Sequence, residues 1–377
     1  MNTVALLSCP DYDPIKVAET VKRAVDLVGG IKAFVRPGQR VLLKPNLLAA
    51  RPPEKRVTTD PAVVMAVGRL VQKAGGEVII GDSPALDPFR RVARLTGMRE
   101  VAEALGADLS ELSESTRIKP SSESIFKDLH LASQALEADV VINLPKLKTH
   151  CQMLLTLGVK NLFGTVVAQR KAEWHSMAGI SRSTFASLLL DICRAVKPAL
   201  TILDGVWGME GHGPSNGSPR HFGLLAASAD PLALDLAICR LLEVPWDRFP
   251  LYGVAVQRGF FNGDPRSLMI KGEDERLFQA KGLILPELDS LDFLPRALSP
   301  LARRYLASRP VRLQDRCTNC QACVDICPVQ CISQKPQGLT FDYDRCIRCY
   351  CCQEVCPQDA IGFKKGLILR ALNWMGR

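Results

Sequence analysis

The chain has 377 residues, 47% of them hydrophobic and 23% charged, which are the proportions of an ordinary folded protein. This length predicts two or three domains. No run reaches the roughly 18 apolar residues of a membrane span, and the first ten residues lack the basic start of a signal peptide, so we expect neither. The net charge of +9 is not gathered into a basic block with interleaved aromatic residues, so nucleic acid is not an expected partner.

The first hundred residues alternate between short apolar runs and amphipathic stretches. Runs of Val, Leu and Ile predict strands, whereas apolar residues three or four positions apart predict helices. Asp60 followed by Pro61 is a typical helix start. The expected elements are a strand at residues 3–8, a helix at 14–28, a strand at 40–44, a helix at 62–74 and a strand at 77–81.

The same alternation continues to about residue 242. Strands that alternate with helices form mainly parallel sheets, because each connection lays its helix on a face of the sheet. We therefore expect an α/β fold, with a mainly parallel sheet and helices on both of its faces. The further expected elements are a helix at 87–106, a less regular segment at 107–131, a strand at 139–144, helices at 154–163 and 183–196, a strand at 200–203, a glycine-rich loop at 205–217, a strand at 222–227 and a helix at 232–242.

The composition changes after the α/β domain, which we assign to residues 1–282. Prolines and apolar residues from 283 to 310 predict an ordered connector rather than a free linker. Residues 311–365 form a small α+β domain defined by its cysteines. Residues 366–377 are expected to form an amphipathic tail that docks on its own protein, since only two Arg accompany its apolar residues.

Two copies of one cysteine run define the small domain. The runs begin at Cys317 and Cys346, 346 − 317 = 29 residues apart, and each has the pattern C-x2-C-x2-C-x3-C-P. This is the bacterial [4Fe–4S] spacing, in which the fourth cysteine of each run ligates the other cluster. It predicts two [4Fe–4S] clusters, one held by Cys317, Cys320, Cys323 and Cys356, the other by Cys346, Cys349, Cys352 and Cys327.

Other uses of the cysteines fit the pattern less well. Paired C-x2-C units also hold zinc, but a zinc site does not explain eight cysteines in two runs that both end in Cys-Pro. A chain of this length needs no disulfide framework. Cys331 and Cys351 align with Ala360 and Ala322 of the other copy, so we expect them to pack rather than to ligate, while the role of Cys151 stays open. Thiolate ligands and unpaired cysteines favour a reducing compartment, hence the cytoplasm.

Polar side chains follow the ends of four expected strands. Ligands of open α/β sheets bind beyond the carboxyl ends of the strands, so these side chains predict one site. If the chain stays extended, Lys146, Lys148 and His150 share one face. The candidate ligand-binding residues are Lys44, Asn46, Asp82, Asn143, Lys148, Lys160, Asp204 and Gly205, and the candidate catalytic residues are His150 and Lys146.

Lysines and a histidine together favour an anionic small molecule, with His150 or a lysine as the proton donor. The plainer interpretation is that Lys146 and Lys148 are solvated surface charges and that Asn143 caps a turn. The glycines of residues 205–217 let the backbone approach a ligand closely or simply form a flexible turn. A divalent metal held by Glu210, His212 and His221 is a further alternative, although this spacing is weakly specific.

At these residues the chain resembles domain-of-unknown-function family 362. The motifs are Leu-Lys-Pro-Asn at 43–46, Thr-Asp-Pro at 59–61, Gly-Asp-Ser at 81–83, Asn-Leu-Pro-Lys-Leu-Lys-Thr-His at 143–150, Gly-Val-Lys-Asn at 158–161 and the stretch at 204–214. The resemblance covers about residues 1–260, and family members often carry a C-terminal two-cluster ferredoxin module, as residues 311–365 do. It implies little about chemistry, because the family is largely uncharacterised.

The sequence as a whole predicts an iron–sulfur oxidoreductase that relays electrons through two [4Fe–4S] clusters to or from an anionic small molecule in the α/β domain. A redox partner protein is then required. The alternatives are a non-enzymatic ferredoxin-type electron carrier or docking subunit of a redox complex, and a redox-linked ligand sensor. Neither the substrate nor the oligomeric state follows from the residues.

Overall fold

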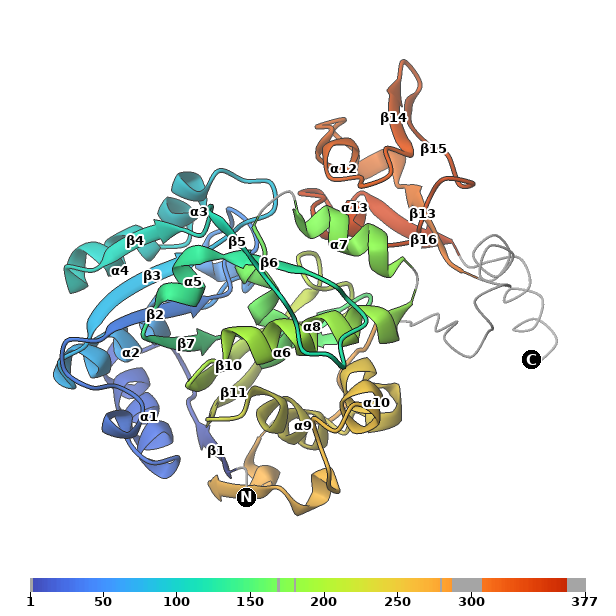
Figure 1. Ribbon diagram of the computed structural model, residues 1–377. Helices are drawn as coiled ribbons and strands as arrows, with labels where there is room; N and C mark the ends of the chain where they lie inside the picture. Colours follow the sequence, from blue (N-terminus) through green and yellow to red (C-terminus); the bar gives the residue numbers. More distant parts are fainter. Residues whose placement is uncertain (1–2, 168–169, 180, 279, 287–306, 365–377) are drawn as a thin grey trace.

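The computed structural model describes residues 3–167, 170–179, 181–278, 280–286 and 307–364. Most of the expected connector at 283–310 and the whole expected tail at 366–377 lie outside these residues. In the described ranges the chain forms a large α/β domain and a smaller cysteine-rich module (Figure 1).

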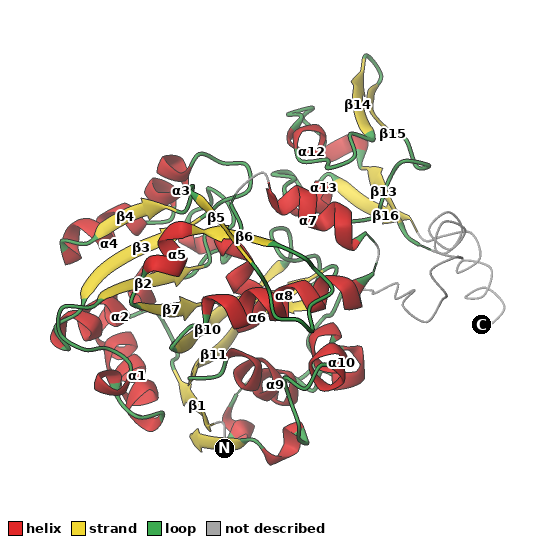
Figure 2. Ribbon diagram, viewed as in Figure 1, coloured by secondary structure: helices red, strands yellow, loops and turns green. Residues whose placement is uncertain are grey.

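A ten-stranded sheet forms the centre of the α/β domain (Figure 2). The strand β8 (Lys146–His150) pairs with β10 and with β9 (Leu154–Thr156) beside the main path. The order along that path is β12 (Met269–Gly272), β1 (Thr3–Ser8), β11 (Ser218–Ser228), β10 (Leu200–Glu210), β7 (Val140–Leu144), β2 (Arg40–Pro45), β3 (Glu77–Asp82) and β4 (Asp108–Glu111).

Most neighbours in this sheet are parallel, which confirms the expected fold class. The exceptions are β11, antiparallel to both β1 and β10, and the β8–β9 pair. Strands β10, β7, β2, β3 and β4 run parallel to one another. Their carboxyl ends therefore lie at one edge of the sheet, where open α/β sheets bind ligands.

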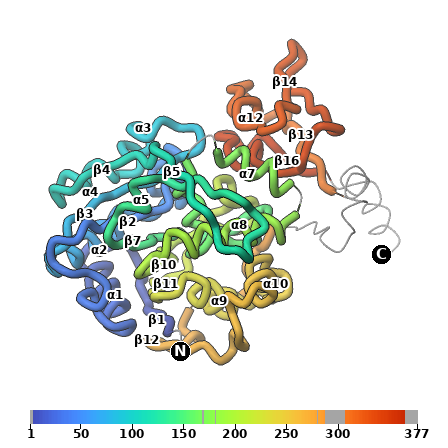
Figure 3. The backbone as a smooth tube through the Cα atoms, viewed as in Figure 1, coloured from blue at the N-terminus to red at the C-terminus, as the bar shows by residue number. Residues whose placement is uncertain are grey.

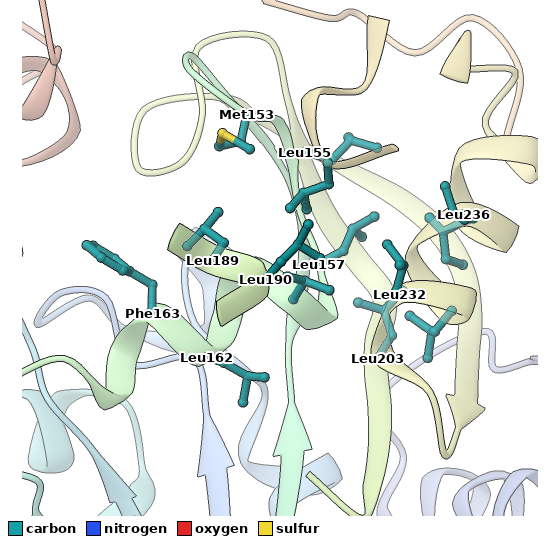
Figure 4. Packing of buried hydrophobic residues seen from close by; sticks show 14 of the residues in the cluster. Met153, Leu155, Leu157, Leu162, Phe163, Leu189, Leu190, Leu203, Leu232 and Leu236 are labelled. Carbon is teal, nitrogen blue, oxygen red and sulfur yellow. The ribbon is translucent and has the colours of Figure 1, made fainter. Parts of the chain in front are cut away.

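Helices cover both faces of the sheet because successive strand residues point to opposite sides. In β1, Val4 and Leu6 join one core cluster, whereas Ala5 and Leu7 join the other. Figure 4 shows residues of the cluster that contains Val4, among them Leu190 of α8 (Arg182–Val196) beside Leu157. The helices that pack on the cluster containing Ala5 are α1 (Pro14–Leu27), α2 (Pro61–Lys73), α3 (Phe89–Leu95) and α4 (Met98–Leu105). The helices that pack on the cluster containing Val4 are α5 (Ser133–Glu137), α6 (Gly158–Asn161), α7 (Arg170–Ala178), α8 (Arg182–Val196), α9 (Pro231–Leu241) and α10 (Pro250–Gln257).

Two expected helices differ from the structure. Residues 87–106 form α3 and α4, separated at Gly97, whose φ of 74° does not continue a helix. The apolar stretch at 154–163 is not one helix but β9 followed by the short α6. The break occurs because the carboxylate of Asp235, in α9, accepts hydrogen bonds from the Gly158 and Val159 N–H groups at 2.6 and 3.0 Å and starts a new helix there.

The expected glycine-rich loop is also shorter than predicted. Strand β10 continues through Gly205 and Gly208 to Glu210 and pairs with β11. A Cβ on Gly208 would lie 2.3 Å from the Leu147 carbonyl oxygen, and one on Gly205 would lie 2.9 Å from the Leu224 side chain. These glycines therefore allow close packing of strands.

The cysteine-rich module repeats one small unit twice. Its helices α12 (Ala322–Asp325) and α13 (Cys351–Glu354) occupy equivalent positions in the 29-residue repeat. Strand β13 (Arg309–Arg312) pairs with β16 (Ile361–Lys364), and β14 (Ile332–Lys335) pairs with β15 (Gly338–Phe341). A separate hairpin in the α/β domain joins β5 (Ser115–Ile118) to β6 (Leu129–Ala132).

The module lies beside α7 and the carboxyl ends of the strands (Figure 3). Gln353 of α13 joins it to the loop at 211–217: its side chain donates to the His212 carbonyl oxygen at 3.1 Å, and its own carbonyl accepts from the Asn216 side chain at 3.0 Å. The module therefore covers the edge at which open α/β sheets bind ligands.

Candidate functional site

The ends of β2 and β3 meet in a buried ion pair. Lys44 Nζ lies 2.9 Å from Asp82 Oδ1, and neither side chain is more than 5% exposed. The other carboxylate oxygen of Asp82 accepts the Leu47 N–H at 2.7 Å. Backbone at Gly164 closes over the pair, since a Cβ there would lie 2.3 Å from Asp82 Oδ1 and 2.5 Å from Lys44 Nζ. The parallel order of β2 and β3 thus brings these two candidate residues together.

A chain of side-chain amides connects the next candidates. Lys148 Nζ donates to Asn46 Oδ1 at 2.9 Å and to the Val57 carbonyl oxygen at 2.7 Å. Asn46 donates to Asn161 Oδ1 at 2.9 Å, and Asn161 donates to Asn143 Oδ1 at 2.8 Å. This network holds the amine of Lys148 next to the segment that carries Lys160.

Lys146, Asp204 and Gly205 lie apart from these residues. Lys146 Nζ is 2.8 Å from Asp204 Oδ2 and 2.6 Å from the Tyr12 hydroxyl, and it is buried. The cause is the pairing of β8 with β10, which sets Lys146 opposite Asp204. The lysine amine is therefore neutralised locally and does not line the cavity described next. A ligand role for these three residues remains a prediction.

A cavity of about 340 Å³ lies between the α/β domain and the module. Six of the candidate residues line it, together with residues of α7, α13 and the first cysteine run. The side chains that matter for its chemistry are Lys44, Asn46, Asp82, Lys148, His150, Lys160, Lys171, His175, Cys320 and Glu354.

Three of the cavity lysines have no carboxylate partner within 4 Å among the described residues. Burial, with the charges of Lys160 and Lys146, lowers the pKa of Lys148 to about 7. Burial also lowers the pKa of Lys171 to about 7 and that of Lys160. Lys171 donates to the Ser83 carbonyl oxygen at 2.5 Å, and Lys160 lies 4.7 Å from the Phe163 ring centroid. The cavity therefore contains cationic groups that its own walls do not neutralise.

His150 lines this cavity, and its hydrogen bonds define which ring nitrogen carries the proton. Its Nδ1 accepts the backbone N–H groups of Gln152 and Met153 at 3.1 and 3.2 Å, so in the neutral ring the proton is on Nε2. Burial, with the charge of Lys160, holds the pKa of His150 well below its usual value. Nε2 makes no hydrogen bond within the described ranges, although Glu354 Oε1 lies 3.2 Å away. His150 therefore offers a neutral N–H donor.

This tautomer also bears on metal binding. His150, Cys151 and Glu354 place one ligand atom each within 4.8 Å of one another, the single such group in the described part of the chain. A protonated Nε2 has no lone pair for a cation, so His150 in this tautomer does not offer that atom to a metal.

The second candidate metal site involves other contacts. Glu210 pairs with Arg220 at 2.7 Å, and His221 Nε2 lies 2.7 Å from the Pro10 carbonyl oxygen. The metal alternative at Glu210, His212 and His221 therefore has no support in the geometry.

Lys171 and His175 are cavity residues that sequence reasoning missed. Both project from α7, four positions apart and thus on one helix face. His175 is 5% exposed, its Nδ1 has no hydrogen-bond partner in the described residues, and burial lowers its pKa to about 3. The signal available in the sequence was this Lys-x3-His spacing in an otherwise polar segment.

The two cysteine runs enclose two small cavities in the module. One is lined by Cys317, Cys320, Cys323 and Cys356. The other is lined by Cys327, Cys346, Cys349 and Cys352, with Cys331 and Cys351 also on its wall. Each cavity gathers the four cysteines of one predicted ligand set, and their role as cluster ligands remains a prediction.

Further contacts fit thiolate-bound clusters. The N–H of Cys331 donates to Cys327 Sγ at 3.3 Å, and the equivalent N–H of Ala360 donates to Cys356 Sγ at 3.2 Å. Arg348 is 2% exposed, yet its Nε and Nη2 have no hydrogen-bond partner among the described residues. Such a buried cation needs a nearby anion, which a thiolate-ligated cluster supplies.

The fold and these sites define an iron–sulfur protein with a cavity-bearing α/β domain. The chain belongs to the family defined by the domain of unknown function DUF362, which matches residues 41–240, and a 4Fe–4S dicluster domain matches residues 316–360. Both the expected resemblance and the expected iron–sulfur module are thereby confirmed. No helix in the described ranges is both long and apolar enough to cross a membrane.

Proteins similar to this chain include one relative by sequence and two solved structures. A thylakoid-associated protein of Synechocystis sp. is 41% identical over 307 residues, which cover 81% of this chain and 95% of that protein. The lactate racemase apoprotein of Thermoanaerobacterium thermosaccharolyticum is 11% identical with a TM-score of 0.41, over 64% of this chain and 57% of its own. A Thermotoga maritima protein is 11% identical with a TM-score of 0.35, over 52% and 51%. The chain thus spans little more than half of these two solved structures.

Proposed function

We propose that this protein is an iron–sulfur oxidoreductase in which two [4Fe–4S] clusters exchange electrons with an anionic small molecule in the cavity between the two domains. One observation carries the proposal. Cys320 and Pro357 line both this cavity and the first cysteine cavity. A ligand in the cavity therefore lies against the walls of a cluster site, and no further carrier is needed between them.

The side chains of the cavity have separate tasks in this proposal. Lys148, Lys160 and Lys171 bind the anionic groups, because their charges are otherwise unpaired. The Nε2–H of His150 donates a hydrogen bond to the ligand as a neutral group. The clusters, when bound, supply or accept single electrons.

A redox partner protein is proposed to reach the first cluster from outside. Thr318, Asn319 and Cys320 are exposed in the described structure, so the first cysteine run faces solvent as well as the cavity. Unpaired cysteines and thiolate ligands support a reducing compartment, and we propose the cytoplasm. The thylakoid association of the Synechocystis relative suggests a membrane surface as one place where the partner is met.

The test starts from anaerobically reconstituted protein with its clusters reduced by dithionite. A panel of carboxylated and phosphorylated metabolites is added, and the return of the visible absorbance of the oxidised clusters is recorded. We expect at least one anion to oxidise the wild type and the exposed-lysine control Lys73→Met, but to oxidise Lys148→Met at least tenfold more slowly. If every anion leaves the clusters reduced while a carrier protein oxidises them, the protein is an electron carrier and the proposal is wrong.

A further inference from the structure

The charges around the cavity do not balance. Lys44 is neutralised by Asp82 at 2.9 Å. Lys148, Lys160 and Lys171 have only neutral acceptors or an aromatic face in the described structure. Arg51, Asp87 and Arg91 also line the cavity but are more exposed, and Asp87 pairs with Arg91 at 3.6 Å. Among the buried groups, Glu354 is therefore the carboxylate left to the three lysines. When all three amines are protonated, their charges against that of Glu354 leave an excess of 3 − 1 = 2 positive charges. Buried charges without counter-charges are costly, so an occupied cavity needs two negative charges from its ligand.

Two unpartnered groups in the same walls point independently to a ligand. His150 Nε2 and His175 Nδ1 belong to side chains that are 1% and 5% exposed, and neither atom has a hydrogen-bond partner within the described residues. Buried polar groups are normally satisfied. Both residues line the cavity, so both nitrogens are available to a polar ligand.

We propose that the cavity binds a small dianion, with two carboxylates or one fully ionised oxyanion, and that binding draws protons onto the cavity lysines. This inference rests on the proposed function, because it specifies the ligand of the same cavity. It follows from the chemistry of amines: in the empty cavity their mutual repulsion and burial favour the neutral form, and a dianion reverses both effects.

The direction of the pH dependence follows from the same groups. Near pH 8 the amines of Lys148 and Lys171 are mostly neutral in the free protein, since burial lowers both pKa values to about 7. In the complex they are charged, so binding takes up protons and weakens as the pH rises above 7. The titratable groups that face these amines are Lys44, Asp82, Lys146, His150, Lys160 and His175, and Glu354 of the module.

Calorimetric titration of the oxidised protein tests the inference without any electron transfer. The probes are succinate against propionate and sulfate against methanesulfonate, each at constant ionic strength. We expect the dianion of at least one pair to bind tenfold or more tightly than its monoanion. Titration in two buffers of different ionisation enthalpy should give an uptake of about one to two protons per sulfate or succinate at pH 8 and fewer at pH 6.

Variants show which lysines take up the protons when the dianion binds. Lys171→Met should lower the uptake by about one proton and the affinity about tenfold, whereas Lys73→Met, on an exposed position of α2, should change neither. If Lys171→Met does not hold its clusters, Lys148→Met makes the same test. Equal binding of monoanions, binding without proton uptake, or failure of both dianions to bind would each overturn the proposal.

The outcomes for the two proposals are separable. Dianion binding with proton uptake, but no oxidation of reduced clusters by any anion, would remove the oxidoreductase and keep the dianion site. Cluster oxidation by a monoanion, with no binding of either dianion, would do the reverse.

Discussion

His150 Nε2 in strand β8 lies 3.2 Å from Glu354 Oε1 in helix α13. The cavity wall formed by the α/β domain therefore meets the iron–sulfur module at this point. The ring is neutral, because burial holds its pKa well below the usual range. Its Nε2–H makes no hydrogen bond in the described structure and is therefore available to a ligand.

Replacing His150 by Phe should remove this donor and lower the affinity for sulfate or succinate at least tenfold, the cost of a hydrogen bond to a charged group of about 1.5–3 kcal/mol. His150→Gln keeps an N–H near the same place and should retain most of the affinity. Both values come from calorimetry. The pH dependence of the affinity should come from the lysines and should persist in His150→Gln; a pH dependence that disappears in His150→Gln would mean that the imidazole becomes charged.

Gly164 provides a second test, because it closes over the Lys44–Asp82 pair. A Cβ in Gly164→Ala would lie 2.3 Å from Asp82 Oδ1, so the pair must move. We expect a loss of about 1–3 kcal/mol in the free energy of unfolding together with weaker anion binding. Gly253→Ala, in α10, is the control: nothing lies within 4 Å of its added Cβ, so it should be neutral or slightly stabilising in denaturant titrations.

The ligand sets of the clusters can be checked by iron content. Wild-type protein should hold about eight iron and eight sulfide per chain after anaerobic reconstitution. Cys331→Ala and Cys351→Ala should keep them, while Cys327→Ala should lose iron from the cluster whose other ligands include Cys346. Cys331 Sγ lies 3.5 Å from Cys327 Sγ, so it is the closest competitor for that role. Cluster loss in Cys331→Ala would mean that Cys331, and not Cys327, is the ligand.

The sequence predicts the parts of this site that follow from patterns of residues close together in the chain. Lys44 and Asp82 end neighbouring parallel strands, and their meeting follows from the strand–helix alternation alone. The spacing of the cysteines predicts which of them share a cluster, because both runs lie within 41 residues, from Cys317 to Pro357. Both features require only short-range patterns and a general rule about sheets.

The remaining parts depend on contacts that no local pattern contains. Lys146 turns away from the cavity because β8 pairs with β10, a pairing between segments 58 residues apart at Lys146 and Asp204. Lys171 enters the cavity because α7 packs beside the module. Glu354, between two cysteine ligands, becomes a cavity residue through docking of the module. From the sequence alone, Lys146 is expected in the site, and Lys171 and Glu354 are given no role.

The last prediction concerns Arg348, which is equivalent to Asn319 in the other repeat. Both residues have a positive φ, 60° and 56°, so the two cysteine loops share a backbone shape. They differ in charge and exposure: Asn319 is exposed, whereas Arg348 is 2% exposed and donates to the Cys346 carbonyl oxygen at 3.2 Å. The guanidinium charge therefore acts on the second cluster site from within a poorly solvated environment.

Reduction adds a negative charge to a cluster, and a buried cation stabilises it. Arg348→Gln should therefore lower the reduction potential of one cluster by about 40–130 mV, equivalent to roughly 1–3 kcal/mol for one electron. Potentiometric titration followed by electron paramagnetic resonance separates the two clusters. Arg345→Gln is the matched control, since Arg345 is exposed and solvent screens its charge. Equal shifts of both clusters, or no shift in a variant that keeps eight iron, would show that Arg348 does not tune the second cluster.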